Sequence, residues 1–167
     1  MGFPERQLVT VVVDLANFTH SVRGMDAPAI AGLVDRFYHQ VHDAAADHGG
    51  RVVKHLGDGC LVVFPADQAV DAVDFVESLR SHVEDMATPS GGRLGLGANI
   101  HLSTVAEGEL GPDRRYDVVG AGVIHTFRMG GGEGIRISEP VYRKLPSERR
   151  SGWTKRQPPA TYTRAAS

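Results

Sequence analysis

The sequence has little of several features that define whole classes of protein. It contains one cysteine, Cys60, in 167 residues, so an internal disulfide framework is excluded and a reducing compartment is favoured. No apolar run approaches the roughly 20 residues of a membrane-spanning helix, and the start MGFPERQLV lacks the apolar centre of a signal peptide. Basic and acidic residues are nearly balanced, 18 against 20, which gives no reason to expect nucleic acid or a membrane as partner. We therefore expect a cytoplasmic domain.

What is present is typical of one globular α+β domain over residues 1–167. Apolar residues make up 41% of the chain and charged residues 23%, which suffices for a core of ordinary size. The spacing of apolar residues predicts strand 8–15, helix 28–48, hairpin 51–64, helix 67–86, strand 93–102, a partner strand at 104–111 (TVAEGELG), helix 120–129, strand 134–138, a helical turn at 139–145 and two edge strands within 153–164. This β-α-β-β-α-β order with additional C-terminal strands is the ferredoxin-like plan.

Two acidic residues stand at chemically suggestive places. Asp14 ends the apolar run LVTVVVD, and Asp58 lies in the hairpin turn of RVVKHLGDGCLVVF, where a glycine on each side removes bulk and leaves the carboxylate accessible. Either residue alone is more typical of a cap or a turn. If the two strands are neighbours, however, the carboxylates would repel each other and favour a divalent cation, and Mg²⁺ prefers such oxygen ligands together with phosphate. The loop LANFTH, which contains Phe18 and Thr19, offers consecutive backbone N–H groups for a phosphate.

Four segments carry a resemblance to a known family. VVVDLANFT, GGRVVKHLGDG, LGLGANIH and RRYDVVGAGVIHTFR occur in an order and at intervals that resemble the catalytic domain of class III adenylyl and guanylyl cyclases, over about residues 7–163. The resemblance implies the class III cyclase homology fold and conversion of ATP to 3′,5′-cyclic AMP and pyrophosphate. It also implies two divalent ions, Mg²⁺ or Mn²⁺, held by Asp14, Asp58 and the backbone carbonyl of Leu15.

The same resemblance implies roles for residues that contact the nucleotide. Lys54 and Asp117 match the pair that selects the purine in adenylyl members, and lysine suits the acceptor N1 of adenine while ionised aspartate accepts from its amino group. Arg128 matches the arginine that stabilises the pentavalent phosphorus. Lys155 falls where the family places a lysine on the triphosphate, with Arg156 as a competing register. Without the resemblance, Lys54 would be a solvated lysine at a strand edge, Asp117 a helix N-cap and Arg128 an exposed helix residue.

The sequence departs from the family pattern at one important position. Ile124 stands where the family has an asparagine that orients the ribose, and Ala121 and Asn17 replace a common acid and a common glycine. Because isoleucine cannot donate a hydrogen bond, we expect a slow enzyme, since one lost transition-state contact commonly lowers the rate by roughly 10²–10³. The alternative is a catalytically impaired ATP-binding module with a regulatory role. A diguanylate cyclase is disfavoured, because LGDGC does not match the Gly-Gly-(Asp/Glu)-Glu-Phe turn of that class.

The resemblance also bears on assembly. Active sites of the family form between two domains, one supplying the metal-binding acids and the other the purine-binding residues. A chain with one such domain is therefore expected to form a head-to-tail homodimer. The association is expected to be weak enough for a monomer to occur in solution.

Overall fold

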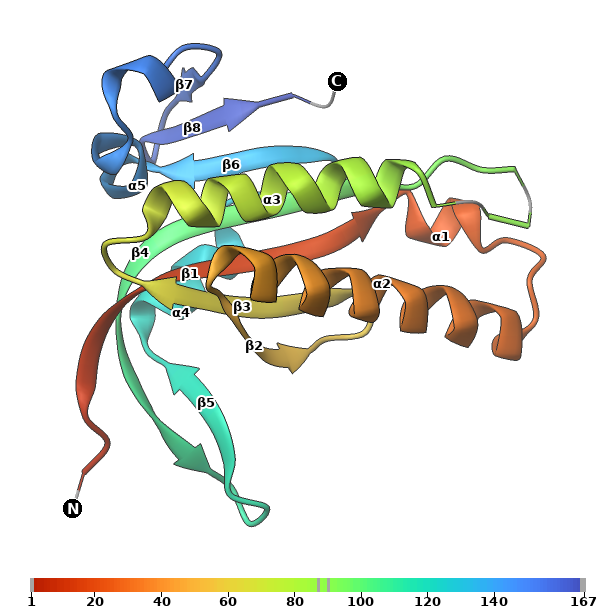
Figure 1. The fold of residues 1–167 in the computed structure, drawn as a ribbon, viewed down its shortest axis with the longest axis horizontal. Helices are drawn as coiled ribbons and strands as arrows, with labels where there is room; N and C mark the ends of the chain where they lie inside the picture. The colour runs from red at the N-terminus through yellow and green to blue at the C-terminus, as the bar shows by residue number, and fades with distance from the viewer. Residues whose placement is uncertain (1, 87, 90, 166–167) are drawn as a thin grey trace.

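The computed structural model describes residues 2–86, 88–89 and 91–165, which form one eight-stranded sheet with helices on both faces (Figure 1). The elements are, in chain order, β1 (Glu5–Ala16), α1 (Phe18–Ser21), α2 (Ala27–His48), β2 (Arg51–His55), β3 (Gly59–Pro65), α3 (Ala69–Glu84), β4 (Gly95–Leu110), β5 (Arg115–Val119), α4 (Ala121–Arg128), β6 (Gly134–Ser138), α5 (Glu139–Lys144), a 3₁₀ turn (Ser147–Arg149), β7 (Thr154–Arg156) and β8 (Thr161–Arg164).

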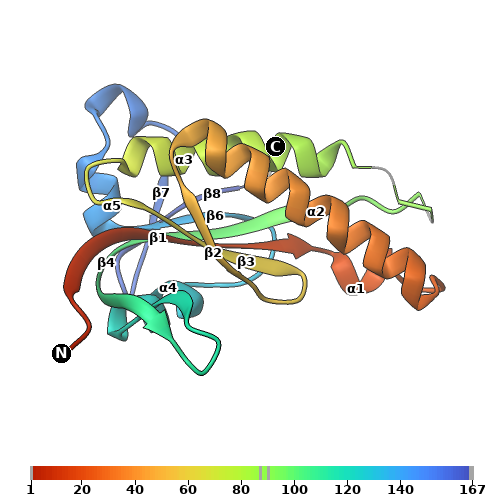
Figure 2. The same ribbon diagram turned by 60° about the horizontal axis from the view of Figure 1, so that its bottom comes forward.

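The sheet contains the ferredoxin-like core that the sequence predicts. Strands run in the order β2-β3-β1-β4-β6-β8-β7, with β5 paired to β4. Each of the first four strands is antiparallel to its neighbour, whereas β6 pairs with β4 in parallel. Helices α2 and α3 cover one face of the sheet, and α4 lies against the other face (Figure 2).

The core follows from the alternation of side chains along β1. Val9, Val11 and Val13 are fully buried and belong to the main core cluster beneath α2 and α3, because successive side chains of a strand point to opposite faces. Helix α2 begins at an N-cap, Asp26, whose carboxylate accepts from the Ala29 N–H at 2.9 Å. The other face of the sheet holds a smaller buried cluster under α4.

The predicted partner strand at 104–111 is wrong. Those residues continue β4, which runs for 16 residues to Leu110, and the strand that pairs with them is β5. The turn lies later than expected, at Gly111 (φ 75°) and Arg114 (φ 52°). The alternation persists through Val105, which is buried in the smaller cluster, so the strand continues past the polar Ser103–Thr104 step. The loop expected after Asp14 is instead the end of β1 followed by the short helix α1.

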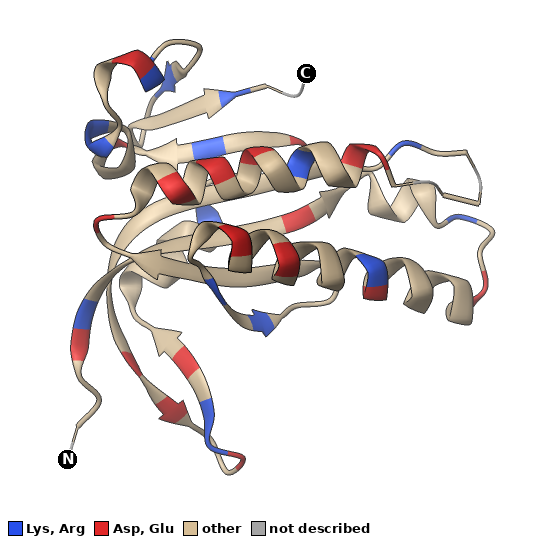
Figure 3. Ribbon diagram, in the orientation of Figure 1, with Lys and Arg blue, Asp and Glu red and all other residues tan. Residues whose placement is uncertain are grey.

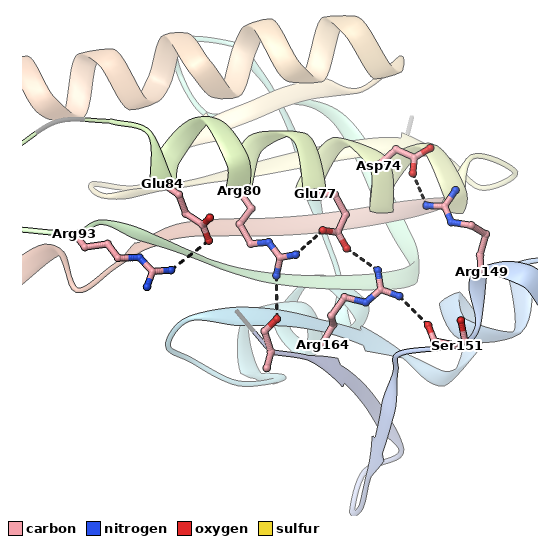
Figure 4. A network of polar contacts seen from close by, with 9 residues as sticks. Asp74, Glu77, Arg80, Glu84, Arg93, Arg149, Ser151 and Arg164 are labelled. Atoms are coloured by element: carbon pink, nitrogen blue, oxygen red, sulfur yellow. Dashed lines mark hydrogen bonds and ion pairs between the residues drawn. The ribbon is translucent and has the colours of Figure 1, made fainter. Parts of the chain in front are cut away.

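The two strands expected near the C-terminus are present as β7 and β8, but only β7 lies at the edge, because β8 pairs with β6 and β7. Ion pairs fix this segment to α3 (Figure 4). Arg164 donates to Glu77 at 2.7 Å, and Glu77 also accepts from Arg80 at 2.7 Å. Arg149 pairs with Asp74, one turn before Glu77 on the same helix. Charges of both signs are interspersed along the ribbon (Figure 3). Among the described residues, no helix has the length and apolar character to cross a lipid bilayer.

Candidate functional site

The strand register brings Asp14 and Asp58 to one cleft. Asp14 on β1 lies opposite Gly59 on β3, and the Leu15 N–H donates to the Asp58 carbonyl at 2.9 Å. Both acids line a cleft of about 180 Å³ at the end of the strands. The structure thus places side by side two carboxylates that the sequence separates, as a metal site between them requires. The Leu15 side chain is buried and apolar, so only its backbone carbonyl could contact a metal ion.

The electrostatics of this acid cleft favour a bound cation. Burial raises the pKa of Asp14, the nearby Asp58 carboxylate raises it further, and Arg136 acts in the opposite direction. A divalent ion would relieve the burial and repulsion of the charged form. Within the described part of the chain, no group of three or more His, Cys, Asp or Glu side chains converges as a metal cage. The residues therefore fit a hard ion that takes further oxygen ligands from backbone, water or phosphate.

Glycines shape the cleft, although in a different way from that predicted. Gly57 (φ 66°) has open space around it and lets the hairpin turn. Gly59 instead lies against β1, because an added Cβ atom would come within 2.8 Å of the Val13 carbonyl oxygen. Gly97 on β4 has a similar role, since a Cβ atom there would collide with Asp14 Oδ1 and with the Gly132 carbonyl oxygen. The glycine after Asp58 thus serves strand packing, and only the one before it leaves open space.

Helix α2 braces the loop that carries Asp58. The Tyr38 hydroxyl donates to the Gly57 carbonyl, and its ring stacks on His55 with centroids 4.0 Å apart. His42, one turn further along α2, is hydrogen-bonded to His55 at 2.9 Å. These contacts fix the hairpin from the side opposite to β1.

Arg136 is a residue of the acid cleft that sequence reasoning missed. It lies on β6 between the buried Ile135 and Ile137, so its side chain points to the opposite face of the sheet from theirs and lines the cleft. Its Nε–H donates to Asn99 Oδ1 at 2.6 Å. The alternation in GIRIS was the available signal, because an arginine between two buried isoleucines must point away from their core.

Lys54 and Asp117 meet, but in a second cleft. Lys54 Nζ on β2 lies 3.0 Å from Asp117 Oδ2 on β5, and both line a cleft of about 470 Å³. None of the described residues that line this cleft also lines the acid cleft. Asp117 is a strand residue and α4 begins after Gly120, so the reading of Asp117 as a helix N-cap is wrong.

The remaining predicted residues lie at the surface or at the edge of the core. Arg128 is exposed at the end of α4, and Ile124 on the same helix is 54% exposed. Lys155 on β7 is exposed, with its ammonium 5.9 Å from the centre of the Tyr162 ring. Its competitor, Arg156, is also exposed on β7. None of these four residues lines either cleft.

The two loop residues predicted to cradle phosphate fall in α1. Phe18 packs against the main core, whereas Thr19 is exposed. The first described backbone bond of this helix comes from the Ser21 N–H to the Asn17 carbonyl, so the amides of Phe18 and Thr19 precede the bonded turn.

Helix α4, which carries Ile124 and Arg128, is held to the sheet by buried hydroxyl groups. Thr10 Oγ1 lies 2.7 Å from Ser103 Oγ and 2.8 Å from Thr126 Oγ1. His101 is hydrogen-bonded to Ser138 at 2.8 Å; burial, assisted by the neighbouring His125, lowers its pKa to about 4. This polar layer positions the helix above the central strands.

Comparison with curated proteins gives partial matches. No model of a known protein family matches the chain. An adenylate cyclase of Streptomyces coelicolor is 37% identical over 83 residues, half of this chain and 20% of that protein. An adenylate cyclase of Anabaena cylindrica is 26% identical over 155 residues, 84% of this chain and 31% of that protein. An uncharacterised protein of Mycobacterium tuberculosis is 27% identical over 142 residues, 77% of this chain and 23% of that protein. The chain thus spans between a fifth and a third of the length of these relatives.

Comparison with solved structures gives matches over nearly the whole chain. The catalytic core of a rhodopsin-guanylyl cyclase with converted specificity, in complex with ATPαS, has a TM-score of 0.84 at 19% identity and covers 98% of both chains. The guanylate cyclase domain from Catenaria anguillulae, in complex with GTP, has a TM-score of 0.81 at 18% identity and covers 98% of this chain and all of that one. These matches confirm the fold that the sequence resemblance implies.

Proposed function

We propose that this chain, whose fold is that of nucleotidyl cyclase catalytic domains, is a class III adenylyl cyclase domain that converts ATP to 3′,5′-cyclic AMP and pyrophosphate in the cytoplasm. The observation that carries the proposal is the meeting of Asp14 and Asp58 in one cleft at the ends of β1 and β3. The curated relatives named adenylate cyclase support it.

The proposed reaction joins the ribose 3′-oxygen to the α-phosphorus. The bond from that phosphorus to the oxygen bridging to the β-phosphate breaks, and pyrophosphate leaves with the bonding electron pair. The proton of the 3′-hydroxyl is released to water. Asp14, Asp58 and the Leu15 carbonyl would hold two divalent ions, Mg²⁺ or Mn²⁺, which when bound lower the pKa of the 3′-hydroxyl and neutralise phosphate charge. Phe18 and Thr19 would present backbone N–H groups to the triphosphate.

The Lys54–Asp117 pair supports ATP over GTP. The lysine supplies donors only and the ionised aspartate supplies acceptors only, and the two groups lie 3.0 Å apart. Adenine presents an acceptor at N1 beside a donor amino group, so it complements both groups. Guanine presents a donor at N1 beside an acceptor at O6, which reverses the match.

The separation of the two clefts supports a homodimer. In one chain the acids and the purine pair line different clefts, so one triphosphate and its base need elements from two copies if both pairs act on it. We propose that a head-to-tail dimer joins the acid cleft of one copy to the Lys54–Asp117 cleft of the other. Arg128 and Lys155, both exposed, would then contact phosphates across the interface. Weak association would leave much of the protein monomeric.

A second candidate, an ATP-binding module without turnover, rests on Ile124. Its exposed side chain offers no hydrogen bond at the position expected to orient the ribose. This candidate predicts ATP binding by calorimetry with no product at any metal concentration. The enzyme predicts binding together with slow product formation, lowered by roughly 10²–10³ relative to a chain with that donor.

The test is product formation from ATP and from GTP, each with Mg²⁺ and with Mn²⁺, for the native chain and two variants. Asp58→Ala is expected to lower turnover by at least about 10³-fold, because one of two carboxylates at the metal site is lost. Asp47→Ala, an exposed acid on α2, is the matched control and should leave turnover unchanged. Cyclic AMP formation that survives Asp58→Ala would remove the proposed mechanism.

A further inference from the structure

Arg136 is the only cationic side chain among the described residues that line the acid cleft. The strands place it near the carboxylates, because the Gly132 carbonyl oxygen, which accepts from Arg136 Nη2 at 3.1 Å, flanks Gly97 together with Asp14 Oδ1. The positive charge of Arg136 is also close enough to act on Asp14, because it opposes the rise in the pKa of that carboxyl group. A positive charge thus stands where the proposed function needs divalent ions.

The guanidinium of Arg136 is fastened in place. Asn99, 4% exposed, accepts from Arg136 Nε–H at 2.6 Å and donates to the carbonyl oxygens of Thr126 and Gly130 at 2.9 and 3.0 Å. Gly130 lies so close that an added Cβ atom would come within 2.6 Å of Arg136 Cδ. The side chain is therefore held between β4, β6 and the end of α4, and it cannot leave the cleft when a metal ion arrives without breaking these bonds.

A fixed cation has opposite effects on the two components of a metal–nucleotide complex. It repels a divalent ion that enters alone, and it attracts the triphosphate. The described hydrogen bonds of Arg136 use its Nε–H and an Nη2–H, which leaves further guanidinium donors for phosphate oxygens. Burial of the site strengthens both effects, because screening by water is reduced there.

We propose that Arg136 makes metal binding at Asp14 and Asp58 conditional on nucleotide. Its charge keeps the acid pair from collecting free divalent ions, and a triphosphate reverses this by adding negative charge. The inference rests on the proposed function, because it assumes that the acid pair is the metal site. It assigns to Arg136 a role in coupling the two ligands, apart from any role in the chemical step.

The experiment measures Mn²⁺ binding to the full-length chain by electron paramagnetic resonance, alone and with α,β-methylene-ATP, in which the bond that must break is blocked. In the native chain the analogue should tighten Mn²⁺ binding by at least about tenfold, within the usual range of coupling between sites. Arg136→Met should bind Mn²⁺ alone about tenfold more tightly than the native chain, so the factor by which the analogue tightens binding should fall about tenfold. Arg136→Lys keeps the charge and should retain the weak binding of free Mn²⁺. Arg143→Met, an exposed arginine of α5, is the matched control and should behave as the native chain does.

Each outcome separates this inference from the proposed function. If Asp14→Asn abolishes Mn²⁺ binding but Arg136→Met leaves the free-ion affinity unchanged, Arg136 is a structural buttress and only the coupling role is overturned. If Asp14→Asn leaves Mn²⁺ binding intact, the metal site is elsewhere and both proposals fail. Should Arg136→Met not fold, Arg136→Gln, which keeps a donor for Asn99 while removing the charge, takes its place with the same expected tenfold gain.

Discussion

The acid cleft and the Lys54–Asp117 cleft are built in contrasting ways. Asp14 and its neighbours lie on β1, β3, β4 and β6, whose backbone hydrogen bonds fix the distance between like charges. Lys54 and Asp117 lie on β2 and β5, outside this central group, and form an ion pair. Arg51 on β2 also lies over the Tyr116 ring of β5, 3.5 Å from its centre. The fold holds two like charges together in the acid cleft, whereas the second cleft holds a pair of opposite charges that attract each other.

The contrast also appears in exposure and volume. The Lys54 and Asp117 side chains are 39% and 23% exposed, so their ion pair contributes little to stability. Their cleft is also the larger, about 470 Å³ against about 180 Å³. The smaller cleft thus suits metal ions, and the larger, more exposed one suits a base that must enter and leave.

Mixing two damaged chains tests whether the regions work across copies, and carries the largest expected effect. Asp14→Ala and Lys54→Ala should each be nearly inactive alone. An equal mixture should recover roughly a quarter of native activity, because half of the dimers are mixed and each mixed dimer has one intact site. Cyclic AMP formation against mixing ratio is the measurement. A mixture that stays inactive, with both chains folded and dimerising, would contradict composite sites.

Exchange of the purine pair should alter specificity and leave the acid cleft intact. Lys54→Glu combined with Asp117→Cys is expected to shift the ratio of GTP to ATP turnover by about 10²-fold or more, because each base would meet reversed donors and acceptors. Mn²⁺ affinity in the presence of a nucleotide analogue, measured alongside, should change little. The single change Lys54→Met serves as control, since it removes the donor without favouring guanine. A double variant with an unchanged nucleotide ratio would count against the pair as the purine reader.

Restoring a hydrogen-bond donor at position 124 on α4 should raise the turnover rate. Ile124→Asn is expected to raise turnover by roughly 10²-fold, because an amide regains a contact with the ribose in the transition state. Ile124 is 54% exposed, so the change should disturb packing little. Ile124→Ala is the control for the loss of the isoleucine alone. Equal rates for the two variants would show that this position does not reach the ribose.

The smallest expected effect concerns stability. Because the pKa of Asp14 is raised by burial and by Asp58, the folded state holds its proton more tightly than the unfolded state does. At neutral pH the charged form therefore opposes folding, and Asp14→Asn should raise Tm by a few degrees. This gain should shrink as the pH falls through the raised pKa toward 3.8, the ordinary value. Asp117→Asn, at the satisfied pair, should give no such gain. Thermal unfolding at several pH values measures the Tm of both variants. Equal Tm shifts for Asp14→Asn and Asp117→Asn would contradict the view that only Asp14 is held in an unfavourable environment.

Much of this arrangement was predictable from the sequence, because period-two alternation fixes which strand residues share a face. The pairing of Asp14 with the Asp58 turn follows from the ferredoxin-like order. The error at TVAEGELG arose because the polar Ser103–Thr104 step resembles a break between two strands, whereas in the structure β4 continues through it to Leu110 and Gly108 pairs with Asp117 on β5. Arg136 was missed because its partner Asn99 is brought beside it by the parallel pairing of β4 with β6. The alternation in GIRIS indicates where the arginine points but not what it meets.

The length of β4 has a mechanical consequence. Its residues 95–106 pair with β1 and residues 97–100 pair with β6 beside the acids, whereas residues 106–110 pair with β5, which carries Asp117. A single unbroken strand therefore connects the proposed metal site with the proposed purine-binding residue Asp117. A partner that bends β4 would displace both regions at once. Binding to the paired strands β4 and β5 would therefore alter the acid cleft without contacting it.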